Sequence, residues 1–414
     1  MLTAWQWSPQ PEAGTLVREQ VGAICGRSDF ATHLAARLLR DAGTRIVDLV
    51  ELLVLPEPEV ARAMACGWKA TGPGIYANHA GQFPKVAVGD EPGLFIKVES
   101  AAEFLKAHGL ERTIESGRAR IDRGFGVIEQ RCSDASAPEI LEVFQNRDRE
   151  GFEDVERIVE EAVAAIGSTS AALLFSQAER EFWQSRNRAA QVQKRRQDAL
   201  GIGWANHDHH TYRSSRGNFA RMITLFERLG FHCRERFYAG LAAGWGAQVL
   251  ENPAAGIVLF CDVDLTPDEL QGDFAHEGLA TRSQLNTIGL WCELHGDSLL
   301  QAGMHHLECT FAFDALREQL AAEHIASMKP FTEFSYLRQA FTEGERWRVA
   351  PERLTRLVKN GSITTEQARR FAEEGAVGSH LENLERNDGF KGFNQTGVNE
   401  IIAATDPRRA MAQG

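Results

Sequence analysis

The feature that most constrains this chain is a repeated pattern of strand, helix and further strands, in which each copy opens on a histidine-containing strand. The first copy starts at residues 205–214, where three histidines and an aspartate occupy positions 207–210. The second starts at residues 304–313, and its His306 follows His209 by 97 residues (306 − 209). Two similar supersecondary units in tandem indicate a duplicated fold in which both opening strands line one inner surface.

The residues after each histidine strand fit the same unit. In the first copy, residues 218–229 carry apolar side chains at helical spacing, and Gly230 is placed to end that helix. We therefore expect an α+β fold in which paired βαβββ modules form a cupped sheet. Further elements are predicted at 231–237, 246–251 and 256–263 as strands of the first copy, and at 314–324 (helix) and 327–334 (strand) in the second.

Changes in the pattern of predicted helices and strands divide the chain into three parts. Residues 1–165 are predicted to form an N-terminal α+β domain, mostly helical as far as residue 65. It contains a βαββ-like stretch that could be a degenerate copy of the repeated module. Residues 166–203 are predicted to be a helical linker, and residues 204–414 the metal-binding paired-module domain.

Charge and cysteine content exclude several classes of protein. The net charge of −12 argues against a general binder of nucleic acids or anionic membranes, which needs clustered lysine and arginine. The seven cysteines are odd in number and form no CxxC pair, so we expect reduced thiols and a cytoplasmic location. No window of about 20 apolar residues predicts a transmembrane helix. Whether identical chains assemble is left open.

The alternation of side chains along a strand identifies candidate metal ligands. Residues i and i+2 share a face, so His209 lies with Thr211 and Arg213, and His306 lies with Glu308. Two histidines and one carboxylate on one face, with positions left open, are typical of a redox-active non-haem iron centre.

A third ligand is expected from an Asp or Glu on a late strand of the second unit. The segment 378–386 offers both Glu382 and Glu385. A carboxylate near Asp262 or Asp264, on the last strand of the first unit, would instead indicate a site with four protein ligands.

Several short motifs resemble those of the 2-oxoadipate dioxygenase/decarboxylase family, also called D-2-hydroxyglutarate synthase, a branch of the vicinal-oxygen-chelate superfamily. The likeness covers roughly residues 205–405. It departs from the family at positions 308–310 and in a much shorter segment between the two histidine strands. The matching motifs are His209-x-x-x-Arg213 with Leu229-Gly230, His305-His306-Leu307, Leu337-Arg338-Gln339, and Gly378-Ser379-His380 with Glu385 and Lys391-Gly392.

The resemblance implies a ligand set and a cofactor. Fe(II) would be held by His209, His306 and Glu385, and Glu382 remains a rival for the third position. Residues 124–131 are similar to the family's metal-glutamate strand, which makes Glu129 a weaker rival.

The resemblance also implies an activity. The enzyme would use O2 to decarboxylate and hydroxylate a 2-oxo acid or diacid such as 2-oxoadipate, giving a 2-hydroxy acid and CO2. Arg213 would grip a substrate carboxylate, and Gln339 would hydrogen-bond the substrate or oxygen at the metal. The alternatives are a metal-dependent isomerase or lyase of the same superfamily and a non-catalytic small-molecule-binding module.

Overall fold

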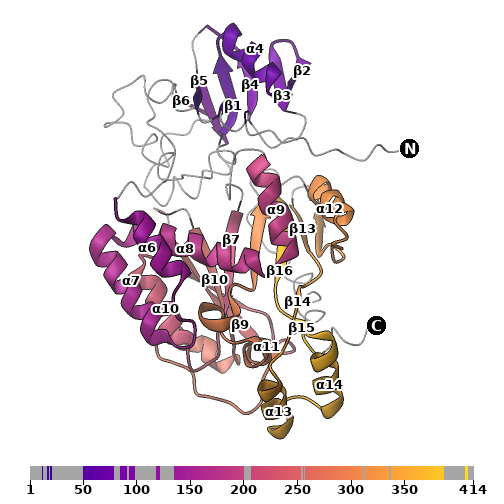
Figure 1. Ribbon diagram of the computed structural model, residues 1–414. Coiled ribbons are helices and arrows are strands. Elements are labelled where there is room, and N and C mark those ends of the chain that lie inside the picture. The colour runs from indigo at the N-terminus through magenta and orange to yellow at the C-terminus, as the bar shows by residue number, and fades with distance from the viewer. Residues whose placement is uncertain are drawn as a thin grey trace.

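The fold is taken from a computed structural model (Figure 1). It describes residues 50–78, 84–90, 93–97, 118–121, 135–199, 207–252, 255, 257–310, 313–334, 337–386 and 406–408, together with positions 12, 16–17 and 19–20. The sequence also predicts a helix at 30–40, a helix and a strand within 101–115, a strand within 124–131, and a loop followed by a short helix within 387–405. These segments lie outside the described residues.

The N-terminal part contains a six-stranded mixed sheet with the order β2-β3-β4-β1-β5-β6. Residues 48–55 were expected to continue a helix, but residues 50–55 form a central strand between β4 and β5. The sequence of this strand, VELLVL, is a short and mostly apolar run. Such runs are typical of buried strands that have a neighbouring strand on each side. The elements are β1 (Val50–Leu55), α4 (Glu57–Ala65), β2 (Trp68–Gly72), β3 (Ile75–Asn78), β4 (Lys85–Val88), β5 (Gly93–Lys97) and β6 (Arg118–Ile121).

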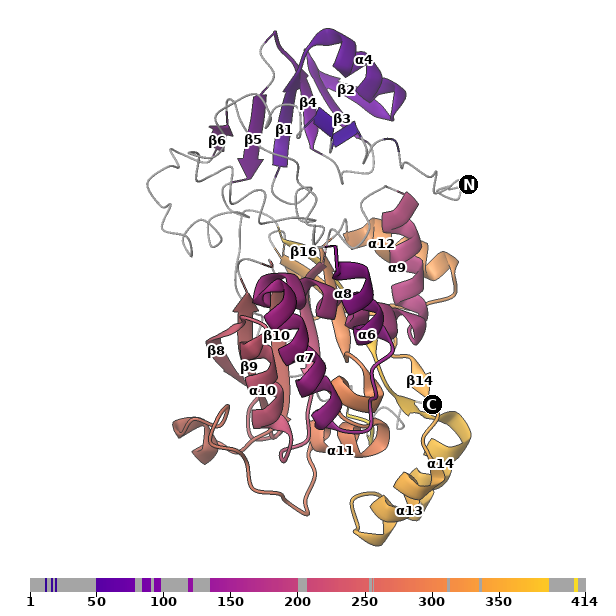
Figure 2. The ribbon, with the colours of Figure 1, turned by 60° about the vertical axis from the view of Figure 1, so that its left-hand side comes forward.

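Two βαβββ modules form a single eight-stranded sheet (Figures 1 and 2). The first module consists of β7 (His207–Arg213), α10 (Phe219–Arg228), β8 (His232–Tyr238), β9 (Trp245–Asn252) and β10 (Ile257–Asp264). The second consists of β11 (His306–Thr310), α12 (Phe313–Ala322), β12 (Thr332–Phe334), β13 (Leu337–Phe341) and β16 (His380–Arg386).

The strand order β12-β13-β16-β11-β7-β10-β9-β8 is symmetric about its centre. In each module the first strand pairs in parallel with the last, β7 with β10 and β11 with β16. The two opening strands, β7 and β11, pair antiparallel in the middle of the sheet. This arrangement confirms the predicted paired-module, vicinal-oxygen-chelate-like fold, and it places both histidine strands side by side.

Helices cover one face of this sheet (Figure 2). The amphipathic α10 buries Phe219, Met222, Ile223, Leu225 and Phe226 in a core that also takes the outward-facing side chains of the central strands. Tyr212 of β7 packs on Phe226 with a ring-centroid separation of 5.0 Å. The helix-covered face, which is the outer face of the sheet, therefore borders a packed hydrophobic core.

The segment expected to be a linker is helical and takes part in this packing. Phe175 and Trp183 of α8 are buried. The ring of Phe175 packs edge-on against Phe226 of α10, with ring centroids 6.4 Å apart. The helices before the sheet are α6 (Ala137–Gln145), α7 (Phe152–Ile166), α8 (Ser168–Ser185) and α9 (Arg188–Ala199).

The inner face of the sheet packs against segments inserted between the strands. A second apolar cluster joins Trp245 and Ala247 of β9 to Trp291 of α11 and to Trp347. The insertion between the modules carries η4 (Asp268–Gln271), α11 (Thr287–His295) and η5 (Ser298–Ala302). The insertion inside the second module carries β14 (Arg346–Trp347), α13 (Pro351–Lys359), α14 (Thr365–Glu374) and β15 (Ala376–Val377).

Among the helices of the described residues, none combines the length and the hydropathy needed to cross a membrane.

Candidate metal centre

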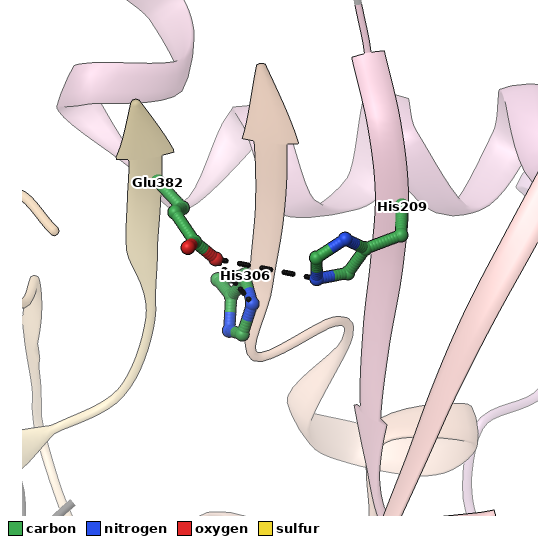
Figure 3. Close-up of side chains that lie close together, drawn as sticks. All are labelled: His209, His306 and Glu382. Atoms are coloured by element: carbon green, nitrogen blue, oxygen red, sulfur yellow. Dashed lines mark ion pairs between the residues drawn. The ribbon is translucent and has the colours of Figure 1, made fainter. Parts of the chain in front are cut away.

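Three neighbouring strands bring two imidazoles and one carboxylate together on the inner face of the sheet (Figure 3). Nε2 of His306 lies 3.1 Å from Oε2 of Glu382, and Nε2 of His209 lies 4.0 Å from the same oxygen. One ligand atom from each of the three residues lies within 4.8 Å of the others. All three residues are buried.

Strand register explains why these residues meet. His306 of β11 lies opposite Thr211 of β7, two residues after His209 and on the same face. On the other side of β11, Glu308 lies opposite Glu382 of β16. The inner face of β11 therefore lies between His209 and Glu382. The predicted juxtaposition of His209 and His306 is present, with ring centroids 5.6 Å apart.

The structure places Glu382, rather than Glu385, beside the two histidines. Residues three apart on a strand point to opposite faces, so Glu385 cannot share the inner face with Glu382. Oε2 of Glu385 instead accepts a hydrogen bond from the backbone N–H of Phe313 at 2.7 Å and lies 3.8 Å from Arg338. The remaining candidate, Glu129, lies outside the described residues.

The separations fit a divalent transition metal. Bonds of about 2.1 Å from nitrogen and oxygen ligands give ligand–ligand edges of about 3.0–3.4 Å at right-angled or tetrahedral geometry. The 3.1 Å between His306 and Glu382 is such an edge. The 4.0 Å between His209 and Glu382 corresponds to a wider ligand–metal–ligand angle.

Two neighbouring side chains are placed to orient the ligands. Nδ1 of His209 lies 3.4 Å from Oε1 of Glu308, a fully buried carboxylate. The amide of Gln339 donates to Oε1 of Glu382 at 3.4 Å. Metal-bound histidines and carboxylates usually have such outer partners, which fix the tautomer and the ring orientation.

His306 is held in the form that a metal needs. Burial, together with the nearby charges of His209 and Arg213, lowers the pKa of His306 well below its ordinary value. The ring is therefore neutral near pH 7 and can offer a lone pair. Its Nε2 also lies 3.0 Å from the hydroxyl of Thr211, and its Nδ1 has no hydrogen-bond partner among the described residues.

Arg213 lies on the inner face of β7, as predicted, in a buried position. Its guanidinium lies over Trp291 at 5.3 Å, and its Nε lies 3.8 Å from Oδ2 of Asp262. That Nε has no hydrogen-bond partner among the described residues. Burial raises the pKa of Asp262 to about 7 against the opposing effect of Arg213, so this carboxylate only partly balances the arginine charge near pH 7.

Among the described residues, the ligand cluster contains no carboxylate from the last strand of the first module. Phe260 of β10 packs on His209, with ring centroids 4.8 Å apart. Asp262 lies beside Arg213. Asp264 accepts hydrogen bonds from the backbone N–H groups of Asn286 and Ile288 at the start of α11.

Sequence reasoning missed the buried neighbours His305 and His380. The ring of His305 packs against the rings of Trp291 and His380, with ring centroids 5.6 Å and 5.1 Å away. Burial lowers the pKa of His380 to about 3. His380 could have been found from its strand, because it shares a face with Glu382 at i+2.

Three solved structures illustrate what the chain resembles in space. A mutant 4-hydroxymandelate synthase from Streptomyces coelicolor aligns with TM-score 0.28 and 15% identity over 49% of this chain and 55% of the synthase. A putative glyoxalase superfamily protein from Ralstonia eutropha JMP134 aligns with TM-score 0.34 and 12% identity over 54% and 84% of the two chains. Methylmalonyl-CoA epimerase from Mycobacterium tuberculosis aligns with TM-score 0.24 and 12% identity over 44% of this chain and 89% of the epimerase.

The chain spans little more than half of the synthase, 55% of its length. No family model matches the sequence, and no curated protein matches it. At TM-scores below 0.5 the structural likenesses assign no activity, so any assignment depends on the side chains described above.

Proposed function

We propose that this chain is a non-haem Fe(II) dioxygenase that decarboxylates and hydroxylates a 2-oxo acid, with a dicarboxylic acid such as 2-oxoadipate as the preferred substrate. The observation that carries the proposal is the buried group of two imidazoles and one carboxylate, His209, His306 and Glu382, on one inner face. This donor set is typical of non-haem Fe(II) oxygenases because it leaves coordination positions for substrate and O2.

When bound, Fe(II) would supply the redox chemistry with O2 that ordinary side chains cannot perform. The protein's part is to hold the ligands and keep water out. Glu308 and Gln339 orient His209 and Glu382, and the apolar rings of Phe260 and Phe341 pack on the two histidines at 4.8 and 5.1 Å.

Arg213 favours a substrate with a second carboxylate. It lies on the same strand face as His209, four residues further along, and its buried charge is only partly balanced by Asp262. A 2-oxo diacid could place its keto-acid end at the metal and its distal carboxylate at the guanidinium, which binds carboxylates with two parallel hydrogen bonds.

A metal-dependent isomerase or lyase is the alternative function, but the contacts made by residues of β10 do not favour it. Such a site would gain a fourth ligand from Asp262 or Asp264, and these carboxylates are engaged by Arg213 and by the start of α11. Phe260 lies beside His209 instead.

Oxygen uptake by anaerobically purified, Fe(II)-loaded protein tests the proposal with a series of 2-oxo monoacids and diacids. We expect one CO2 released per O2 consumed, with the lowest KM for a diacid. Arg213→Lys should keep its iron but raise the KM for diacids about 10- to 100-fold, because a charge-assisted hydrogen bond contributes about 1.5–3 kcal/mol.

Two outcomes would contradict the proposal. Bound iron without oxygen uptake on any 2-oxo acid would point to the isomerase or lyase. Protein that binds no metal would point to a non-catalytic binding module.

A further inference from the structure

A second group of potential ligands lies outside the central site, at the edge of the first module. It consists of Glu227 in α10, Cys233 in β8 and His276 in the turn that follows η4. None of these residues belongs to the strands that carry His209, His306 and Glu382.

The three side chains converge on one point. Nε2 of His276 lies 3.0 Å from Oε1 of Glu227, and Sγ of Cys233 lies 3.9 Å from the same oxygen. All three ligand atoms lie within 4.8 Å of one another. Tetrahedral zinc with bonds of about 2.3 Å to sulfur and 2.0–2.1 Å to nitrogen and oxygen needs edges of about 3.3–3.6 Å, which is close to these values.

The histidine also has the outer partner that metal-bound histidines usually have. Its Nδ1 lies 2.7 Å from Oδ2 of Asp273, which leaves Nε2 directed at Glu227. A carboxylate on the second nitrogen fixes the ring and raises its basicity. Backbone bonds from the N–H groups of His276 and Glu277 to the carbonyl of Asp273 hold the turn in this conformation.

The surrounding charge suits a divalent cation. Glu227 and Asp273 supply two carboxylates, and a coordinated Cys233 would add a thiolate. Arg236 lies 3.3 Å from Oδ1 of Asp273, the oxygen that His276 does not contact, and also donates to the carbonyl of Gly272. The side chains of His276 and Glu227 are 40% and 36% exposed, so an ion can reach them from solvent.

We propose that Glu227, Cys233 and His276 form a second metal site, which binds zinc or a similar borderline-soft divalent ion and fastens the turn at 273–277 to α10 and β8. Thiolate, imidazole and carboxylate together select such an ion over Mg²⁺ or Ca²⁺. Asp273 is a positioning residue, and the fourth coordination position is left to water.

Titration of the full-length chain with Co²⁺ tests this site separately from the central one. A cobalt ion bound by Cys233 gives a thiolate-to-cobalt charge-transfer band in the near ultraviolet. Two imidazoles and a carboxylate give none. We expect the band in the wild type, its loss together with one cobalt per chain in Cys233→Ser, and its retention in Cys66→Ser, which alters another half-buried cysteine.

Two further variants separate ligand from positioning effects and peripheral from central binding. His276→Asn should weaken the band-forming cobalt at least about 100-fold, and Asp273→Asn about 10- to 100-fold, as outer-shell partners do. Glu382→Gln should lose cobalt from the central site and keep the band.

Because Cys233, Glu227 and His276 are partly exposed, these substitutions should leave the fold intact, which circular dichroism can verify. A wild-type protein without the thiolate band would overturn the proposal, and so would a band that persists in Cys233→Ser.

Discussion

The two modules of the eight-stranded sheet have the same topology but contribute different chemistry. Both place a histidine on the inner face of the opening strand, His209 in β7 and His306 in β11. In the first module His209 lies beside Val258 of the closing strand, and in the second His306 lies beside His380. Two residues further along, the closing strands carry Phe260 and Glu382.

This difference shows how a duplicated fold can form an asymmetric site. If both closing strands supplied a carboxylate, the centre would have four protein ligands and little room for other molecules. With Phe260 in place of one carboxylate, the first module supplies one imidazole and an apolar wall. The second module supplies the other imidazole and the acid, which would leave open positions on a bound metal.

The largest effects should follow from removing either module's histidine. His209→Ala and His306→Ala should each lower metal affinity by more than about 100-fold, because even outer-shell partners contribute 10- to 100-fold. Iron analysis of Fe(II)-loaded protein after dialysis measures this directly. His232→Ala, a change at an exposed histidine of the first module, is the matched control and should keep its metal. Full occupancy in either site variant would show that the modules do not share one ion.

Making the modules more alike tests the asymmetry itself. Phe260→Glu would place a carboxylate at the position equivalent to Glu382, beside His209. We expect metal affinity to rise and oxygen uptake to fall, each by about 10-fold, because a fourth protein ligand fills a position otherwise open. Phe260→Gln has nearly the same shape without the charge. Equal behaviour of the two variants would contradict the proposed equivalence.

Gln339 provides a smaller test of the second module. Its amide donates to Glu382, and its oxygen lies 3.5 Å from the hydroxyl of Thr332. Gln339→Ala should weaken metal binding by about 10- to 100-fold through the freed carboxylate. Thr332 contacts Gln339 rather than Glu382, so Thr332→Val should weaken metal binding less than Gln339→Ala does. The metal affinities of the two variants can be compared by competition with a chelating dye. A larger loss of affinity in Thr332→Val than in Gln339→Ala would contradict the expected ranking.

The smallest expected effect concerns His295, a buried histidine that belongs to neither module. Burial lowers the pKa of His295 to about 3, and its ring packs between Trp291 and Trp347. The unfolded chain therefore takes up a proton first as the pH falls below about 6.5, so the folded state loses stability in that range.

His295→Gln should reduce the loss of unfolding free energy between pH 7 and pH 5 by up to about 2 kcal/mol, since one group contributes about 1.4 kcal/mol per pH unit. Urea unfolding at the two pH values measures the difference. An unchanged pH dependence would mean that His295 is already protonated in the fold or is not buried.

The paired modules could be predicted because their signal is local and repeated. Apolar spacing identifies α10, and the 97 residues between His209 and His306 identify the duplication. Period two also predicts the inner face of each opening strand, so His209, Arg213 and His306 were placed correctly on it. The strand β1 was missed because a short apolar run fits a helix or a strand equally well.

The third ligand could not be selected by the same means. Motif resemblance indicated Glu385, whereas the inner position belongs to Glu382, because the register of β16 against β11 sets which carboxylate faces the histidines. That register depends on long-range pairing across the insertion between β13 and β16. The contacts of Glu308 with His209 and of Asp262 with Arg213 likewise join different strands, and only the folded sheet brings them together.

The most direct test of the account is the iron content of two matched variants, Glu382→Gln and Glu385→Gln, purified without air and loaded with Fe(II). Both remove one carboxylate from the same strand, one on the inner face and one on the outer. We expect Glu382→Gln to lose its iron and Glu385→Gln to keep close to one iron per chain. The reverse pattern, or full iron in Glu382→Gln, would contradict it.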